Sequence, residues 1–254
     1  IIQNQKKIKE ATAQEISQLV GEAYMMRAYC HFLLVNLYAE PYTHCTPSQT
    51  RGVPMLLEAD VNAIPGSSSV ETVYNQILSD LDNAEQYLNV EEWELGKNYR
   101  FNTTSAQALR ARTYLYMGRW SNALEASKDV LSVYNELEDM NNSTTLPNSY
   151  KSKESIVALE RFSSNLYTAV DMPASEFISL YRSGDQRRTK YFKRVTSSTY
   201  SLLKGRSDEF SCSFRTAEFY LTAAEAAARL GHTTDAINYL TPLMAKRLNS
   251  SAYQ

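Results

Sequence analysis

Two stretches of this chain share the pattern that decides its fold: ALRARTYLYMGRWSNAL at residues 108–124 and AEAAARLGHTTDAINYL at residues 224–240. Each contains an alanine-rich amphipathic run, a glycine, four further residues, and then an alanine followed by an aliphatic residue. A glycine directly after such a run ends a helix in the left-handed conformation. The alanine beyond it lets a second helix cross the first closely. The pattern therefore predicts two helix-turn-helix pairs.

The predicted pairs resemble the tetratricopeptide pattern, in which helix-turn-helix repeats stack into a curved scaffold. We expect Gly118 and Gly231 to adopt positive φ, and Ala123 and Ala236 to be buried where the helices cross. The two glycines are 113 residues apart, far more than one repeat of about 34 residues. Other structure must therefore interrupt the array. We predict helix-pair units near residues 20–88, 103–134 and 215–247, the first of them degenerate.

Composition and charge narrow the class of protein further. The 254 residues include only 8 glycines and 7 prolines, which favours long helices over a turn-rich β architecture. The formal net charge of −2 gives no electrostatic reason to expect nucleic acid or an anionic membrane as a partner. No stretch approaches the roughly 18 apolar residues of a membrane span. We predict a mostly α fold with long irregular loops and little β structure.

The segment QEISQLVGEAYMMRAYCHFLLVNLYAE, residues 14–40, has two adjacent apolar stripes at helical spacing. The first stripe consists of Ala23, Met26, Cys30, Leu33 and Leu37. The second stripe consists of Met25, Ala28, Phe32 and Val35. Two stripes on one helix predict that the helix is packed on more than one side.

The sequence carries no motif for catalysis or cofactor binding. It has no phosphate-binding loop, dinucleotide-binding glycine fingerprint, HExxH or GxSxG motif. Its three histidines and three cysteines do not occur at metal-ligand spacing. Glu92 and Glu94 could be imagined as a glycosidase carboxylate pair, but a solvated acidic loop is the ordinary interpretation. We expect no catalytic residue, no metal and no cofactor.

Aromatic side chains in the predicted loops are the candidate binding groups. Tyrosine (18) outnumbers phenylalanine (8), and a ring with a hydroxyl suits a half-exposed position. A sugar presents C–H groups on one face and hydroxyls around its edge, so flat rings with polar neighbours suit it. The loop-rich segments 89–102 and 141–212 contain the candidate ligand-binding residues Trp93, Tyr99, Tyr150, Tyr167, Tyr200 and Arg206. Ordinary packing is the alternative role for each ring.

Several blocks of the sequence, taken in order, resemble the SusD-like (RagB/SusD) family. They are GEAYMMRAYCHFLLVNLY, GVPMLLE, VETVYNQILSDLDNAEQYL, AQALRARTYLYMGRWSNALEASKDVL, KESIVALE, FISLYRSGDQRR and FRTAEFYLTAAEAAARLG. The order of the blocks is more specific than any single block. The resemblance spans roughly residues 16–247.

The resemblance implies a surface-exposed outer-membrane lipoprotein of Bacteroidetes-type bacteria. Such proteins bind glycans or other nutrients and work with a SusC-like TonB-dependent transporter. The resemblance also implies one SusD-like domain over residues 1–254, in which helix pairs form the scaffold and loops form the ligand side. Family members begin with a signal peptide and a lipid-modified cysteine, and continue with a late Glu-Arg-rich block. We therefore expect truncation at both ends, and membrane contact only through a lipid anchor outside this chain.

These observations together predict a non-catalytic protein that binds an oligosaccharide by ring stacking and hydrogen bonding in a shallow site built from loops. A tetratricopeptide-type adaptor that binds a protein segment and no sugar is the alternative. Such an adaptor is expected to have contiguous repeats of about 34 residues. An enzyme acting on glycosides is a third possibility, and it would require paired carboxylates facing one cleft.

Overall fold

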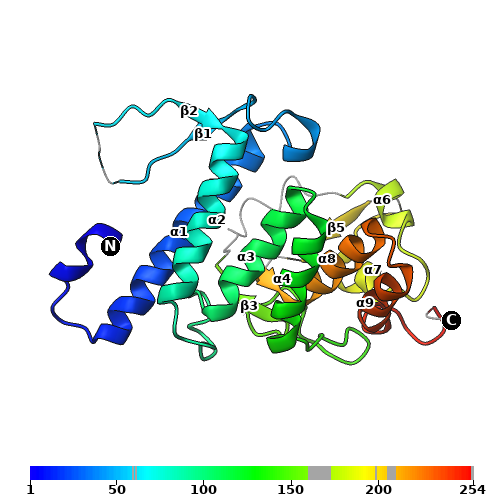
Figure 1. Cartoon of the computed structure of the whole chain (residues 1–254). Helices are drawn as coiled ribbons and strands as arrows, with labels where there is room; N and C mark the ends of the chain where they lie inside the picture. The colour runs from blue at the N-terminus through cyan, green and yellow to red at the C-terminus, as the bar shows by residue number, and fades with distance from the viewer. Residues whose placement is uncertain (59, 61, 160–172, 198, 205–209, 253–254) are drawn as a thin grey trace. The chain divides into compact units, whose positions relative to one another are not determined.

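The computed structural model describes residues 1–254 except 59, 61, 160–172, 198, 205–209 and 253–254 (Figure 1). Helices dominate the described residues, in which each strand has only two to four residues. The strands of this part of the chain form two-stranded antiparallel sheets only. The predicted mostly α fold class with little β structure is confirmed.

The chain divides into two compact units. The first unit comprises residues 1–92 and 101–129, and the second comprises residues 93–100 and 130–254. Helix α4 (Trp120–Val133) carries the chain from the first unit into the second. The assignment of residues 1–254 to a single domain stays a prediction.

The first unit is built around a long helix, α1, which packs along α2, while α3 packs on α2 in turn. Its elements are η1 (Ile2–Lys7), α1 (Ala13–Tyr38), η2 (Tyr42–His44), β1 (Arg51–Pro54), β2 (Ser67–Ser69), α2 (Val70–Tyr87) and α3 (Thr103–Tyr116). Side chains cap the helices: Thr12 and Glu15 form a reciprocal capping box on α1, and Asn102 and Ser105 form one on α3. These bonds satisfy backbone N–H groups that have no partner inside the helix, and so fix where each helix begins.

A buried ion pair joins α1 to α2. The carboxylate of Asp80 is fully buried, and Arg27 donates to its two oxygens from Nε at 2.8 Å and from Nη2 at 2.5 Å. Gln76 donates a third hydrogen bond, from Nε2 at 2.9 Å. The hydrogen bond to Asp80 raises the pKa of the Arg27 guanidinium. The pair therefore fixes the register of the two helices against each other.

Helix α1 buries only one of its two apolar stripes. The buried stripe consists of Met25, Ala28, Phe32 and Val35. In the other stripe Met26 is 43% exposed, Leu33 41% and Leu37 72%. For the described chain, the prediction that this helix is packed on more than one side is therefore wrong. Apolar periodicity identifies the residues that a helix can bury, but not whether a neighbouring element is present to cover them.

The second unit combines short strands with a pair of antiparallel helices. Its elements are β3 (Ser155–Val157), α6 (Ser175–Ser179), α7 (Gln186–Lys190), β4 (Phe192–Arg194), β5 (Tyr200–Leu202), β6 (Phe214–Arg215), α8 (Thr216–Arg229) and α9 (Thr233–Ala245). Strand β3 pairs with β6, and β4 pairs with β5. Helices α8 and α9 pack against each other.

The two glycine turns have the predicted geometry. Gly118 has φ 68° and Gly231 has φ 81°, and Ala123 and Ala236 are both buried. Backbone bonds close both turns in the same way: the N–H of Arg119 donates to Tyr114 O, and the N–H of His232 donates to Ala227 O, each at 2.9 Å. This is the Schellman arrangement, in which the left-handed residue lets the next N–H reach back to the last helical turn. The predicted helix-turn-helix motif is confirmed at both places.

We expect the substitution Gly231→Ala to lower the free energy of unfolding by about 1–2 kcal/mol, the cost of holding a residue with a Cβ in the left-handed region. Nothing lies within 4 Å of the added Cβ, so steric contact contributes nothing. Gly66→Ala is the matched control, because Gly66 also has open space but no positive φ. Urea denaturation of both variants measures the difference. Equal stability of the two would contradict a strained turn at Gly231.

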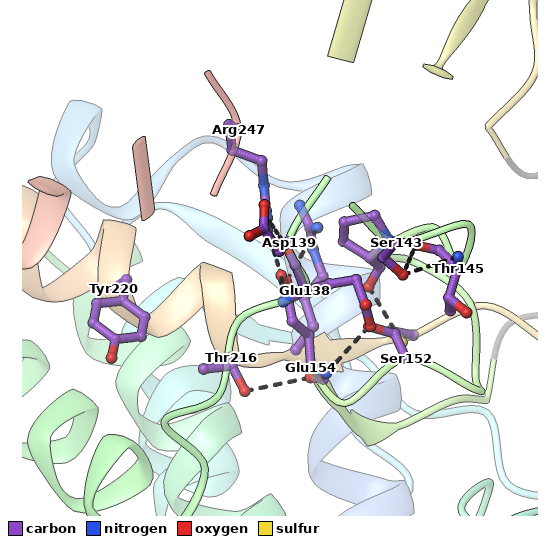
Figure 2. A network of polar contacts seen from close by, with 12 residues as sticks. Glu138, Asp139, Ser143, Thr145, Ser152, Glu154, Thr216, Tyr220 and Arg247 are labelled. Atoms are coloured by element: carbon purple, nitrogen blue, oxygen red, sulfur yellow. Dashed lines mark hydrogen bonds and ion pairs between the residues drawn. The ribbon is translucent and has the colours of Figure 1, made fainter. Parts of the chain in front are cut away.

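A buried ion pair between Glu154 and Arg247 organises the second unit (Figure 2). The Glu154 side chain is 0% exposed and that of Arg247 4%. Arg247 also donates from Nη1 to Glu138 O at 2.6 Å, and the N–H of Glu138 donates to Glu154 Oε1 at 2.9 Å. The N–H of Thr216 donates to Glu154 O at 2.9 Å. The segments of Glu138 and Arg247 therefore meet at the carboxylate of Glu154, and the segment of Thr216 is joined to the backbone oxygen of the same residue.

Removal of the Glu154 charge is expected to destabilise this unit strongly. In Glu154→Gln the guanidinium of Arg247 stays buried without its counter-ion, and Arg215, whose Nη1 lies 3.7 Å from Glu154 Oε2, loses its carboxylate neighbour. We expect the free energy of unfolding to fall by about 3–5 kcal/mol, measured by chemical denaturation. The control is Glu225→Gln, which breaks the exposed pair with Arg229 and should cost no more than about 0.5 kcal/mol. If Glu154→Gln lowers the free energy of unfolding as little as Glu225→Gln does, Glu154 does not organise the second unit.

Candidate functional site

The loop of residues 93–100 consists of two consecutive turns. The N–H of Lys97 donates to Glu94 O at 2.9 Å across Gly96, whose φ is 95°, and the N–H of Arg100 donates to Lys97 O at 3.0 Å. Lys97 Nζ lies 2.6 Å from Glu94 Oε1. Two backbone turns and one exposed ion pair therefore shape this loop.

Asn98 attaches this loop to the segment that leads into β3. Its Nδ2 donates to Tyr150 O at 2.7 Å and to Ser155 Oγ at 3.2 Å. Its backbone oxygen accepts from the N–H of Ala158 at 2.8 Å. Asn98 is not among the residues predicted from the sequence, where its only signal is its position in the loop that carries Trp93.

Two aromatic rings meet beside this attachment, and a third aromatic residue is joined to them through its backbone. The rings of Tyr99 and Phe210 are stacked, with centroids 6.2 Å apart and an angle of 28° between their planes. Both are solvent-accessible: Tyr99 is 45% exposed and Phe210 38%. The N–H of Tyr150 donates to Phe210 O at 3.1 Å, which joins the two backbones. Tyr99 and Tyr150 are therefore brought together as neighbours, and Phe210, which the sequence analysis missed, lies between them in this network.

Two cations lie over rings in the same region. The Arg100 guanidinium carbon is 4.0 Å from the ring centroid of Trp93, and Lys151 Nζ is 5.1 Å from that of Tyr150. Such contacts hold a cation beside the face of the ring. We call the resulting set the aromatic surface; it consists of Trp93, Asn98, Tyr99, Arg100, Tyr150, Lys151 and Phe210.

The remaining predicted site residues are Tyr200, Tyr167 and Arg206. Tyr200 is in β5 and packs against a buried cluster of Met140, Ile178, Tyr191 and Phe192. Tyr200 therefore has a packing role, which is the alternative given above for each ring. Tyr167 and Arg206 lie outside the described residues.

Two titratable groups near this surface have shifted pKa values. The hydrogen bond from Lys97 lowers the pKa of the Glu94 carboxyl. A general acid in glycoside hydrolysis requires a raised pKa, so Glu94 is unsuited to that role. Burial raises the pKa of the Cys212 thiol to about 11, which keeps the thiol protonated and unreactive.

The described residues include no group of three or more His, Cys, Asp or Glu side chains placed to hold a metal ion. In the same part of the chain, no helix is both long enough and apolar enough to cross a membrane.

Comparison with known families identifies the relatives of this chain. The sequence profile of the SusD family matches residues 93–247, which is more than half of the chain. The chain belongs to the SusD family. A second SusD-like profile, described as starch-binding associating with outer membrane, matches residues 2–115. The family resemblance seen in the ordered sequence blocks is confirmed.

Two solved structures and one curated protein are similar to this chain over different lengths. A SusD superfamily protein from Bacteroides thetaiotaomicron is 23% identical with a TM-score of 0.84, over 99% of this chain and 64% of that one. Surface glycan-binding protein A from Bacteroides uniformis is 17% identical with a TM-score of 0.72, over 97% and 63%. A SusD-like protein from Formosa agariphila is 27% identical over 120 residues, 46% of this chain and 21% of the relative. The chain thus spans less than two thirds of the length of these relatives.

We expect Asn98→Ala to loosen the 93–100 loop without unfolding the unit. The variant loses the two hydrogen bonds donated by Nδ2, so the backbone bond from Ala158 to Asn98 O should open more often. Amide hydrogen exchange at Ala158 should accelerate about tenfold, the effect of roughly one neutral hydrogen bond. Ser155→Ala removes only one of the two bonds and should have a smaller effect. Unchanged exchange at Ala158 in Asn98→Ala would mean that another contact holds the loop.

Proposed function

We propose that this protein is a non-catalytic carbohydrate-binding protein that holds a glycan on the aromatic surface. The observation that carries the proposal is the exposed stack of Tyr99 and Phe210, joined to Tyr150 in a member of the SusD family. An exposed pair of rings provides apolar surface, and removal of that surface from water is favourable when a sugar ring covers it. The polar groups beside the rings make this area specific for a ligand with hydroxyls.

The chemistry of the surface suits a neutral sugar. The C–H face of a pyranose packs on an aromatic ring, while the hydroxyls around its edge need hydrogen-bond donors and acceptors. Arg100 and Lys151 lie over rings of this surface and supply N–H donors. Stacking and hydrogen bonding of this kind require neither a metal nor a nucleophile.

The proposal extends to the place and partner of the protein. We infer a position on the outer-membrane surface through a lipid anchor, and delivery of the bound glycan to a SusC-like TonB-dependent transporter. Membership of the SusD family supports this inference, as does the association with the outer membrane in the description of the matching profile. The tetratricopeptide-type adaptor is the less well supported alternative, because the two glycine turns lie 113 residues apart and not about 34.

The experiment is affinity electrophoresis in gels that contain soluble polysaccharides, with starch, xylan and mannan as the first panel. We expect one polysaccharide to retard the protein. Trp93→Ala and Tyr99→Ala should each weaken that retardation about tenfold or more, as expected for aromatic contacts at the centre of a binding surface. Their melting temperatures should change little. Tyr38→Ala is the control, because Tyr38 is an exposed tyrosine of the first unit.

Two results would contradict the proposal at different levels. Equal retardation of wild type, Trp93→Ala and Tyr99→Ala would exclude the aromatic surface as the site. Free migration of folded wild-type protein through every gel of a broad panel would count against carbohydrate binding and in favour of the adaptor.

A further inference from the structure

The second unit contains an open cavity of about 510 Å³ beside the end of α9. Its wall includes Asp139, Asn142, Gln186, Leu248, Asn249 and Ser250, none of which belongs to the aromatic surface. The volume lies within the range of about 300–1,000 Å³ that is typical of sites for small molecules. The cavity is therefore large enough for a ligand of its own.

The backbone around the cavity is held by hydrogen bonds. Asn141 Nδ2 donates to Asp139 Oδ1 and to Leu248 O, each at 3.1 Å. The N–H of Gln186 donates to Arg247 O at 2.9 Å, and Arg247 is the buried partner of Glu154 (Figure 2). The cavity is thus preformed, because its wall is fixed by the same contacts that hold the unit together.

The charge in the wall is compensated. Asp139 Oδ2 accepts from Lys246 Nζ at 3.1 Å and from Asn142 Nδ2 at 3.3 Å, and Asp139 Oδ1 accepts from the backbone and side chain of Asn141. A carboxylate that is paired with an ammonium group and holds these hydrogen bonds offers little attraction to a cation. It also leaves no free positive charge for an anion. The lining therefore favours a neutral ligand.

The groups left available are neutral donors and acceptors. The side-chain amide of Gln186 and the hydroxyl of Ser250 have no hydrogen-bond partner in the described part of the chain, and the same holds for Asn142 Oδ1 and Asn249 Nδ2. Leu248 and Ala245 add apolar surface to the same wall. A sugar hydroxyl both donates and accepts, so amides and a hydroxyl around an apolar patch match a polyhydroxylated ring.

We propose that this cavity is a second carbohydrate subsite, which binds one neutral sugar unit through amide hydrogen bonds and without aromatic stacking. The class of ligand rests on the proposed function, whereas the location of the subsite rests on the cavity alone. In this subsite the amides of Gln186 and Asn249 contact hydroxyls, while Leu248 contacts a C–H face.

The test is a titration of ¹⁵N-labelled protein with glucose, galactose, mannose and xylose, followed through the side-chain NH₂ signals of asparagine and glutamine. The Gln186 and Asn249 signals should shift in a saturable way with one of these sugars. The double variant Asn142→Ala/Gln186→Ala should weaken that sugar about tenfold, as expected for loss of neutral hydrogen bonds, while the remaining Asn249 signal reports binding. Asn238→Ala, which alters an exposed amide of α9, is the matched control.

The outcomes separate this inference from the proposed function. Saturable shifts at Gln186 and Asn249 that persist in Trp93→Ala support a separate subsite, even if Trp93→Ala leaves polysaccharide binding unchanged. Absence of shifts at Gln186 with all four sugars overturns the subsite, and leaves the aromatic surface intact if Trp93→Ala abolishes polysaccharide binding. Equal shifts at Asn238 and Gln186 would show general solvent effects and would also overturn the subsite.

Discussion

The buried ion pair between Glu154 and Arg247 is the contact on which the second unit depends. Burial of two charges is unfavourable unless further hydrogen bonds satisfy them, and here Glu138, from a third segment, supplies both a donor and an acceptor. The residue after Glu154 begins β3, where Asn98 attaches the loop that carries Trp93. On the other side, Arg247 O fixes the N–H of Gln186. The ion pair between Glu154 and Arg247 therefore positions both the aromatic surface and the cavity beside the end of α9.

The helix pairs have a different role from the loops. Their backbone groups are satisfied within the helices and by caps, and the glycine turns close them with local bonds. Helices of this kind are stabilised largely by contacts between residues that are close in sequence. Their ends are rigid points of attachment for the loops. Loops such as 93–100 have too few contacts to be stable alone, so they carry exposed rings only because the scaffold holds their ends. The 113 residues that separate the two glycine turns contain the segments of Tyr150 and Phe210, whereas the 93–100 loop precedes the first turn.

Local geometry was predictable from the sequence, whereas long-range contacts were not. The turns at Gly118 and Gly231 follow from residues within one helical turn, so the pattern identified them. The exposed stripe of α1 was not predictable, because its exposure depends on which element lies beside it. Phe210 joins the site through contacts with residues more than 50 positions away. Glu154 could not be recognised either, since charged side chains are almost never fully buried and periodicity does not reveal their partners.

The two candidate surfaces would divide the recognition of a sugar between them. Rings select for a flat C–H face and tolerate many sugars, whereas amides select for the positions of hydroxyls. Each neutral hydrogen bond contributes only about 0.5–1.5 kcal/mol, so either site alone should bind a short sugar weakly. A long polysaccharide presents many equivalent units, and occupation of one site raises the effective concentration at the other. Such an arrangement would retain long chains more strongly than short fragments.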